Sequence, residues 1–204
     1  MKIDSPNAPL RHPRAELPSH RPGDPFWRGL LWRCAGQWIC KFSFHNWYAL
    51  RCMVLRICGA KLHPTVKIRA SVRIDRPWNL RMGKLSAVGD HAKLLCRSRI
   101  DVGPYCTISQ YNKVFTQAED PLDPQRRIYT APIRIEKDAW LAADVTVLPG
   151  VTVREGVVVG ARGFVDRELP PWTICTGEPA KPRRERPMLD RTGKDEAPRW
   201  KGAL

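Results

Sequence analysis

The chain has 204 residues, of which 43% are hydrophobic, and it carries a formal net charge of +15. This length accommodates one domain with tails, and the hydrophobic fraction is ordinary for a globular protein. The positive charge favours anionic partners such as phosphorylated cofactors, nucleotide-linked sugars or acidic lipids. The sequence contains no nucleic-acid-binding module, so we expect no nucleic acid partner. The seven cysteines lack zinc-ligand spacing, so we expect reduced thiols, no metal, and a cytoplasmic protein that could lie at the inner face of the membrane.

The N-terminal part of the chain divides into two segments. Residues 1–24 are rich in proline, arginine and histidine, and we expect a disordered tail there. Residues 25–59 form an amphipathic helical segment, because tryptophans and aliphatic side chains recur at i+3 and i+4 spacing. A break at the sequence SFHN predicts two helices, with Asn46 as N-cap of the second and Gly59 as its C-terminal cap. Two roles stay open: the helices could cover one end of the following domain, or residues 26–58 could contact an anionic membrane surface.

Residues 60–168 carry a repeat of six residues. It is uninterrupted in the second half, where an aliphatic residue occupies every sixth position: Ile135, Leu141, Val147, Val153, Val159 and Val165. A period of six fits neither an α-helix nor the alternation of a single strand. It fits a chain that turns a corner every six residues, so that each coil stacks on the previous one. The pattern therefore predicts an all-β solenoid. The alternative, a β-sandwich of valine-rich strands, offers no reason for this period.

The repeat is lost between Ile108 and Ile135, which predicts an outward loop over residues 111–132. Repeat proteins often place binding residues in such loops. A C-terminal segment, residues 169–186, follows the solenoid, and we expect a tail over residues 187–204.

Several motifs along the chain belong together, among them RPWNLRMGKLSAVG, VGPYCTISQ, APIRIEKDAWLAADVTVLPGVTV and ELPPWTICTGEPAK. With these motifs the chain resembles the hexapeptide-repeat acyltransferases, and most closely the colanic acid biosynthesis acetyltransferase group. The resemblance implies a left-handed parallel β-helix that forms a homotrimer. It also implies transfer of an acetyl group from acetyl-CoA to a sugar hydroxyl, in exopolysaccharide or glycan biosynthesis.

In that family a histidine on the outward loop deprotonates the acceptor hydroxyl. An ungapped alignment from ISQ to Pro132 places Glu119 at the position of the histidine and Asp120 at the following aspartate. The loop contains none of the five histidines. A free glutamate has a pKa of about 4.3, against about 6.5 for histidine, so Glu119 would be a weaker base unless burial beside Phe115 or Trp140 raised its pKa. Glu119 could replace the base, another group could do so, or the chain could be a catalytically impaired binding or scaffold protein.

The resemblance also implies binding residues. Trp140 and Gln117 are candidates for the acceptor site. Small side chains match a groove for the pantetheine arm of the cofactor: Ala142, Ala143, Gly160 and Ala161. Basic side chains match positions near the nucleotide phosphates: Arg167, Lys181 and Arg184. The alternatives are that turn geometry alone requires the small residues and that the basic ones are merely solvated. Asp166 would repel phosphates unless an arginine pairs with it.

Overall fold

The computed structural model describes residues 26–119 and 123–187. The expected tails therefore lie outside the described residues, except for Pro187. Short strands form three sheets. Sheet A contains β1 (Lys61–Leu62), β4 (Leu80–Met82), β7 (Ile100–Val102), β12 (Ile133–Ile135) and β15 (Thr152–Val153). Sheet B contains β2 (Lys67–Ile68), β5 (Ala87–Val88), β8 (Thr107–Ile108), β13 (Trp140–Leu141), β16 (Val158–Val159), β18 (Thr173–Thr176) and β19 (Lys181–Glu185). Sheet C contains β3 (Arg73–Ile74), β6 (Lys93–Leu95), β9 (Lys113–Phe115), β14 (Thr146–Val147) and β17 (Phe164–Val165).

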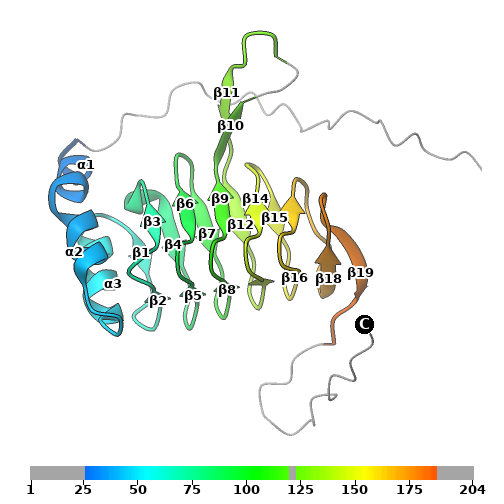
Figure 1. The fold of residues 1–204 in the computed structure, drawn as a ribbon, viewed down its shortest axis with the longest axis horizontal. Coiled ribbons are helices and arrows are strands. Elements are labelled where there is room, and N and C mark those ends of the chain that lie inside the picture. Colours follow the sequence, from blue (N-terminus) through cyan, green and yellow to red (C-terminus); the bar gives the residue numbers. More distant parts are fainter. Residues whose placement is uncertain (1–25, 120–122, 188–204) are drawn as a thin grey trace, which may run out of the picture.

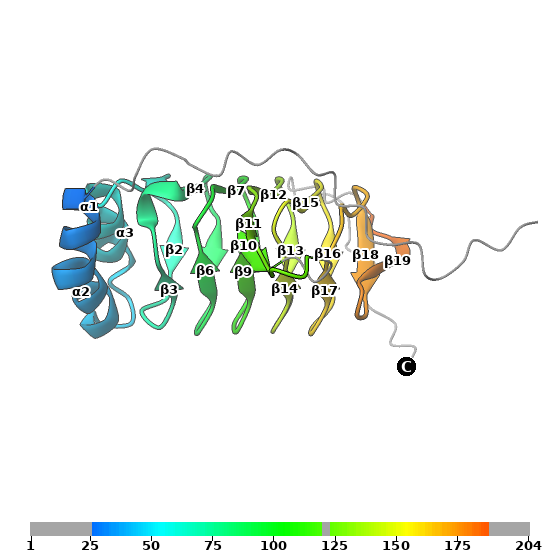
Figure 2. The same cartoon turned by 90° about the horizontal axis from the view of Figure 1, so that it is seen from above.

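The chain visits sheets A, B and C in turn, so each passage makes one triangular coil. The coils stack side by side along the long axis of the molecule (Figures 1 and 2). Strand pairing between coils is parallel, and only β19 runs antiparallel to its neighbour β18 within sheet B. This is the parallel β-solenoid that the six-residue period predicts, and a β-sandwich is excluded.

The aliphatic residue of each hexapeptide points into the coil. Leu141, Val147 and Val153 have no exposed surface, and the interior is a single column of such side chains. Many corners of the coils use one residue with a left-handed backbone conformation. Around one coil these residues are Asp138, Asp144 and Gly150, with φ values of 62°, 57° and 82°. Sharp corners and a column of buried aliphatic side chains therefore generate the repeat together.

The close stacking of coils leaves no room for a side chain at some corners. Gly103 begins the corner between sheets A and B, and its N–H donates to Ile135 O at 2.7 Å in the next coil. A Cβ atom at Gly103 would lie 2.6 Å from the backbone nitrogen of Lys137. Real Cβ atoms do not approach backbone atoms this closely, so the position requires glycine.

The insertion forms a β-hairpin that projects from the solenoid (Figure 1). Its strands are β10 (Gln117–Glu119) and β11 (Ile128–Thr130), which pair antiparallel. The outward loop begins later than residue 111, because β9 keeps its place in sheet C, where Lys113 pairs with Lys93 and Thr146. The hairpin thus occupies the corner between sheets C and A.

Helices cover the first coil, which is one of the two roles left open by the sequence. They are α1 (Phe26–Leu31), the π-helix η1 (Trp32–Gly36), α2 (Gln37–Phe42) and α3 (Tyr48–Ile57), and a 3₁₀ turn η2 (Pro77–Asn79) lies nearby. Trp32 is buried, and its Nε1–H donates to Ile74 O at 3.0 Å. Gly59 ends α3 with a φ of 101°, as expected. The predicted Asn46 cap is wrong, because Trp47 is the N-cap residue of α3 and no side chain caps that helix.

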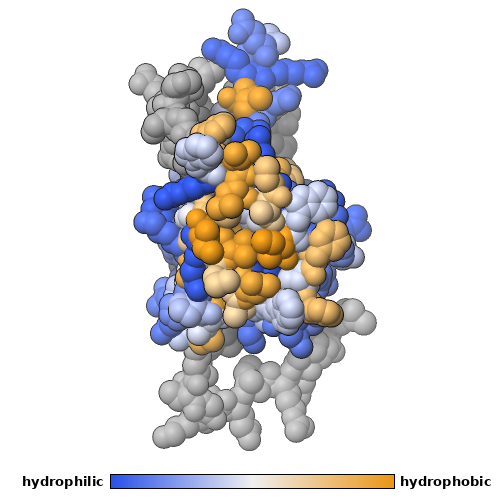
Figure 3. Space-filling model, turned by 90° about the vertical axis from the view of Figure 1, so that its left-hand side faces the viewer, coloured by the Kyte–Doolittle hydropathy of each residue, from blue (hydrophilic) through white to orange (hydrophobic). Residues whose placement is uncertain are grey.

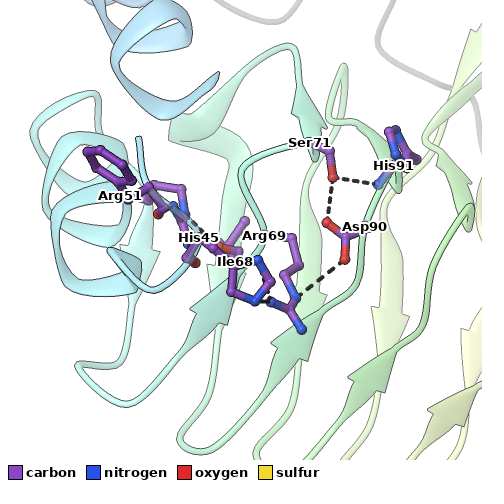
Figure 4. A network of polar contacts seen from close by, with 8 residues as sticks. His45, Arg51, Ile68, Arg69, Ser71, Asp90 and His91 are labelled. Atoms are coloured by element: carbon purple, nitrogen blue, oxygen red, sulfur yellow. Dashed lines mark hydrogen bonds and ion pairs between the residues drawn. The ribbon is translucent and has the colours of Figure 1, made fainter. Parts of the chain in front are cut away.

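Arg51 joins the helices to the first coil. Its side chain is buried, and it donates four hydrogen bonds: to Ile68 O at 2.7 Å, Ser43 Oγ at 2.7 Å, Phe44 O at 2.8 Å and His45 O at 2.8 Å. Figure 4 shows that the polar contacts continue through His45 and Arg69 to Asp90, with an Arg69–Asp90 ion pair of 3.4 Å. The helices and the first two coils are therefore one packed unit.

Two glycine substitutions should have opposite effects on stability. Gly103→Ala should lower the free energy of unfolding by about 1–3 kcal/mol, because the new methyl group collides with the backbone of the next coil. Gly29→Ala should leave that free energy unchanged or raise it by about 0.5–1 kcal/mol, because alanine favours the helix. At Gly29 the nearest atom to a Cβ would be a Trp78 ring carbon at 3.7 Å, an ordinary contact. Urea unfolding followed by circular dichroism measures both, and equal effects would contradict the stacking argument.

Candidate functional site

The outer face of sheet B carries a row of side chains that runs across four strands. Trp140, Val158, Ile174 and Arg184 pair in register on β13, β16, β18 and β19. Trp140 is 46% exposed, and Val158 and Ile174 are half-buried. Neighbouring strands are about 4.8 Å apart, so the row extends about 14 Å from the indole to the guanidinium-bearing strand. The row is an apolar surface with a cation at one end.

A second row lies two residues further along the same strands, and it consists of small side chains. It contains Ala142, Gly160 and Thr176, and it ends at Lys181, which pairs with Thr176. A Cβ atom at Gly160 would lie 2.8 Å from Thr176 Cγ2, so position 160 has no room for a side chain and the surface of the sheet is flat there. We call the two rows together the sheet B strip. The structure thus brings Trp140, the small residues and both C-terminal cations onto one face.

Ala143 and Ala161 border the strip at the corner between sheets B and C. They belong to neighbouring coils, and a hydrogen bond from the Arg162 N–H to Ala143 O, at 2.9 Å, joins the corners of these two coils. Ala161 is exposed. The predicted cofactor residues of sheet B and its corner are therefore neighbours in space.

Hydrogen bonds from the preceding coil position Trp140. Its Nε1–H donates to Ser109 Oγ at 3.0 Å. The buried amide of Asn112 donates to Ser109 O at 2.9 Å and to Ala142 O at 2.8 Å. The sequence reasoning missed Ser109 and Asn112 as supports, as well as Val158 and Ile174 on the strip. The sequence could have predicted Val158, because it follows Trp140 by three hexapeptides. Three hexapeptides make one full coil, so the two residues lie on neighbouring strands of sheet B.

Glu119 does not lie on the strip. It ends β10, opposite Ile128, and its side chain is exposed and makes no hydrogen bond or ion pair within residues 26–119 and 123–187. The expected burial beside Phe115 or Trp140 is therefore absent in the single chain. Gln117 is half-buried on the same strand, and Asp120 lies outside the described residues.

The hairpin and the strip occupy opposite sides of the solenoid. The hairpin leaves the corner between sheets C and A, whereas the strip covers sheet B. In a triangular coil the corner between two sheets faces away from the third sheet. Figure 1 shows the hairpin on one side and strands β5, β8 and β16 on the other. One chain therefore cannot bring its own Glu119 to its own Trp140.

Arg167 lies on the side of the hairpin. It follows β17, in the connection from sheet C to the next coil, and so it is separated from Lys181 and Arg184. Its Nε and Nη2 donate to the two carboxylate oxygens of buried Asp166, each at 3.0 Å. This pairing raises the pKa of the Arg167 guanidinium, chiefly through the hydrogen bonds. It also neutralises the Asp166 charge, which would otherwise repel a phosphate.

The cysteines offer no activated nucleophile at the strip. Only Cys34 is exposed, and the other six are buried. Burial raises the pKa of the Cys40 thiol to about 12 and also raises the pKa values of Cys52, Cys58, Cys96 and Cys175. Within the described ranges no group of three or more His, Cys, Asp and Glu side chains could hold a metal ion.

A cavity of about 530 Å³ lies away from the strip, over sheet A, among basic and acidic side chains. Both acidic side chains of this lining are already paired: Asp101 Oδ2 contacts Arg99 Nε at 2.6 Å, and Glu136 contacts Arg154, which lies outside the lining, at 3.4 Å. The strip and the hairpin are therefore the candidate functional site, rather than this cavity.

Known proteins share both the sequence and the fold. The chain is 40% identical over 156 residues to a protein of Escherichia coli (strain K12) named colanic acid biosynthesis acetyltransferase WcaF, covering 76% of this chain and 86% of that protein. It resembles the crystal structure of a maltose O-acetyltransferase from Clostridium difficile 630, with a TM-score of 0.69 and 22% identity over 78% of this chain and 86% of that one. A similar structure is the hexapeptide-repeat acetyltransferase VCA0836 from Vibrio cholerae O1 biovar eltor, complexed with acetyl coenzyme A. Its TM-score is 0.69 at 24% identity, over 78% of this chain and 86% of that one. No protein-family model matches the sequence.

These findings define the class. The chain belongs to the hexapeptide-repeat acetyltransferases, and it is an enzyme that transfers acetyl groups. Its fold is the left-handed parallel β-helix of that class. The resemblance drawn from the motifs is therefore confirmed, and the alternative of a binding or scaffold protein is not favoured.

Alkylation should separate the exposed cysteine from the buried ones. At about pH 8 iodoacetamide should modify Cys34 and spare Cys40, Cys96 and Cys175, because the thiolate is the reactive form and burial both raises these pKa values and blocks access. Intact mass spectrometry should therefore find one adduct on the folded protein, none on a Cys34→Ser variant, and adducts on all seven cysteines in denaturant. Rapid native labelling of Cys175, which lies beneath the strip, would contradict this arrangement.

Proposed function

We propose that this chain transfers an acetyl group from acetyl-CoA to a sugar hydroxyl in exopolysaccharide or glycan biosynthesis. The observation that carries the proposal is the sheet B strip, which combines a flat row of small residues, an exposed tryptophan and two cations at one end. The names of a relative in colanic acid biosynthesis and of a maltose O-acetyltransferase with the same fold support a sugar acceptor.

The strip suits acetyl-CoA, which would supply the acetyl thioester. An extended pantetheine arm could lie along Ala142 and Gly160, because the contact at Gly160 leaves no room for a larger side chain that would block it. Ala143 and Ala161 would border the arm at the adjoining corner. Lys181 and Arg184 would meet the phosphates through charge-assisted hydrogen bonds at the other end of the strip.

The hairpin would complete the site from a second copy of the chain. A hairpin on one side of each protomer and a strip on the other form a head-to-tail pair of surfaces. Such heterologous contacts close into a ring, and a homotrimer is the assembly that we propose. Arg167 lies on the same side as the hairpin, so it too would approach the strip of the neighbouring copy.

In this arrangement Glu119 would accept the proton of the acceptor hydroxyl. Asp120 would orient the acceptor, and Gln117 and the neighbouring copy's Trp140 would bind it. Glu119 is exposed in the single chain, but contact with the Trp140 ring would remove water from its carboxylate. The competing hypothesis is that another group is the base.

Replacing the carboxylate should test the role of Glu119. Glu119→Gln should lower the rate of acetyl transfer about 10²–10⁴-fold, because a general base contributes an acceleration of that size. Coenzyme A binding, measured by calorimetry, should stay unchanged. The control is Glu168→Gln, another exposed glutamate, whose carboxylate already pairs with Arg154 Nε at 2.6 Å. Unchanged turnover of Glu119→Gln would assign the base to another group, and its failure to bind coenzyme A would indicate a structural defect instead.

Mixing two inactive variants should test whether the site lies between copies. Glu119→Gln removes the base and leaves the strip intact, whereas Ala161→Trp blocks the strip and leaves the hairpin intact. Random mixed trimers should regain up to about a quarter of the wild-type rate, since one interface in four combines an intact hairpin with an intact strip. The rate is measured after unfolding and refolding the two variants together and, as control, separately. No recovery in mixtures whose mixed assembly is verified by mass spectrometry would place both functions within one chain.

A further inference from the structure

The helices at the N-terminal end have two apolar faces, and the solenoid covers only one of them. We call residues 26–57 the helical cap. Its inner face includes Trp32, Cys52 and Leu55, which are buried. Its outer side leaves large apolar side chains exposed, among them Trp27 at 76%, Phe42 at 73% and Ile57 at 62%. Figure 3 shows hydrophobic residues gathered on this end of the molecule.

The exposed surface of the helical cap combines aromatic rings with positive charge. Lys41 Nζ lies 5.5 Å from the ring centroid of Trp38 and 5.7 Å from that of Phe42. The two rings are stacked, with their centroids 5.9 Å apart. Arg28 and Arg33 are also exposed on the same helices. Cations beside aromatic rings are typical of protein segments that lie in the headgroup layer of a bilayer.

Negative charge is absent from this part of the chain. The sequence contains no Asp or Glu between Asp24 and Asp75. A second copy docked symmetrically on this face would therefore bring Arg33 and Lys41 toward like charges without any carboxylate to pair with them. A surface of anionic lipids offers an apolar layer and negative headgroups together.

We propose that the helical cap docks the protein onto the surface of a bilayer that contains anionic lipids. The contact is peripheral, since within the described part of the chain no helix has the length and apolarity to cross a membrane. The longest helical run of the cap extends only from Phe26 to Phe42 through α1, η1 and α2 and carries three cationic side chains, whereas a spanning helix needs about 20 predominantly apolar residues. The inference rests on the helical cap alone and is independent of the proposed function.

Sedimentation with vesicles tests this proposal on the full-length protein. Vesicles of phosphatidylcholine with phosphatidylglycerol should carry the wild-type protein into the pellet, and vesicles of pure phosphatidylcholine should carry much less. The double variant Trp38→Glu/Phe42→Glu should lower the bound fraction about tenfold or more, because it removes two interfacial rings and adds negative charge. The matched control, Leu85→Glu/Leu95→Glu, makes the same kind of change at exposed apolar positions of the coils and should bind like the wild type.

A second variant keeps the test decisive if the first one misfolds. Arg33→Glu/Lys41→Glu alters only exposed charges, so the melting curve by circular dichroism should stay unchanged while binding to anionic vesicles falls. Wild-type protein that stays in the supernatant, equal binding to neutral vesicles, or cap variants that bind like the wild type would each overturn the proposal. So would a lipid-free assembly, seen by analytical ultracentrifugation, that Trp38→Glu/Phe42→Glu dissociates, because a second copy would then cover the face.

Discussion

The spacing of about 4.8 Å between hydrogen-bonded coils governs the rest of this structure. Backbone bonds such as Leu148 N to Val165 O, at 3.0 Å, hold each coil on the next. At this spacing each strand places one or two hydrophobic side chains in the interior, as Leu80 and Met82 do on β4, and the corner at Gly103 admits no side chain at all. Because all coils stack at the same spacing, the outward-facing side chains of successive coils align in rows. The rows of the sheet B strip are therefore a direct product of the stacking that stabilises the fold.

The triangular cross-section has a consequence for catalysis. An insertion at one corner points away from the opposite sheet, so a chain that carries its hairpin between sheets C and A cannot serve its own sheet B. The side chain of Glu119 has no partner among the described residues, and its carboxylate and the indole of Trp140 are both exposed. In the proposed assembly each of them is one half of a shared site. Their exposure in the single chain is what a shared site between copies requires.

The two ends of the solenoid are covered in different ways. At the C-terminal end β19 folds back antiparallel on β18 and presents basic side chains to solvent. These charges disfavour pairing of a further strand with the edge of sheet B. At the N-terminal end the helices cover the first coil, held by the hydrogen bonds from Trp32 to Ile74 O and from Arg51 to Ile68 O. That cover protects the strand edges and apolar interior, but it leaves a new apolar surface outside.

The sequence by itself determined the coil and its contents. A six-residue period is local, so it identifies Leu141 or Val147 as interior and Gly160 as small without knowledge of the neighbours in space. The motifs likewise singled out Ala142, Gly160 and Lys181, which the structure places on one face. Only the tertiary structure decided which residues of different coils share a row, as Trp140, Val158, Ile174 and Arg184 do, because coil register depends on every corner between them. It also decided that Glu119 and Arg167 lie opposite the strip, because the direction of an insertion depends on which corner of the triangle it occupies.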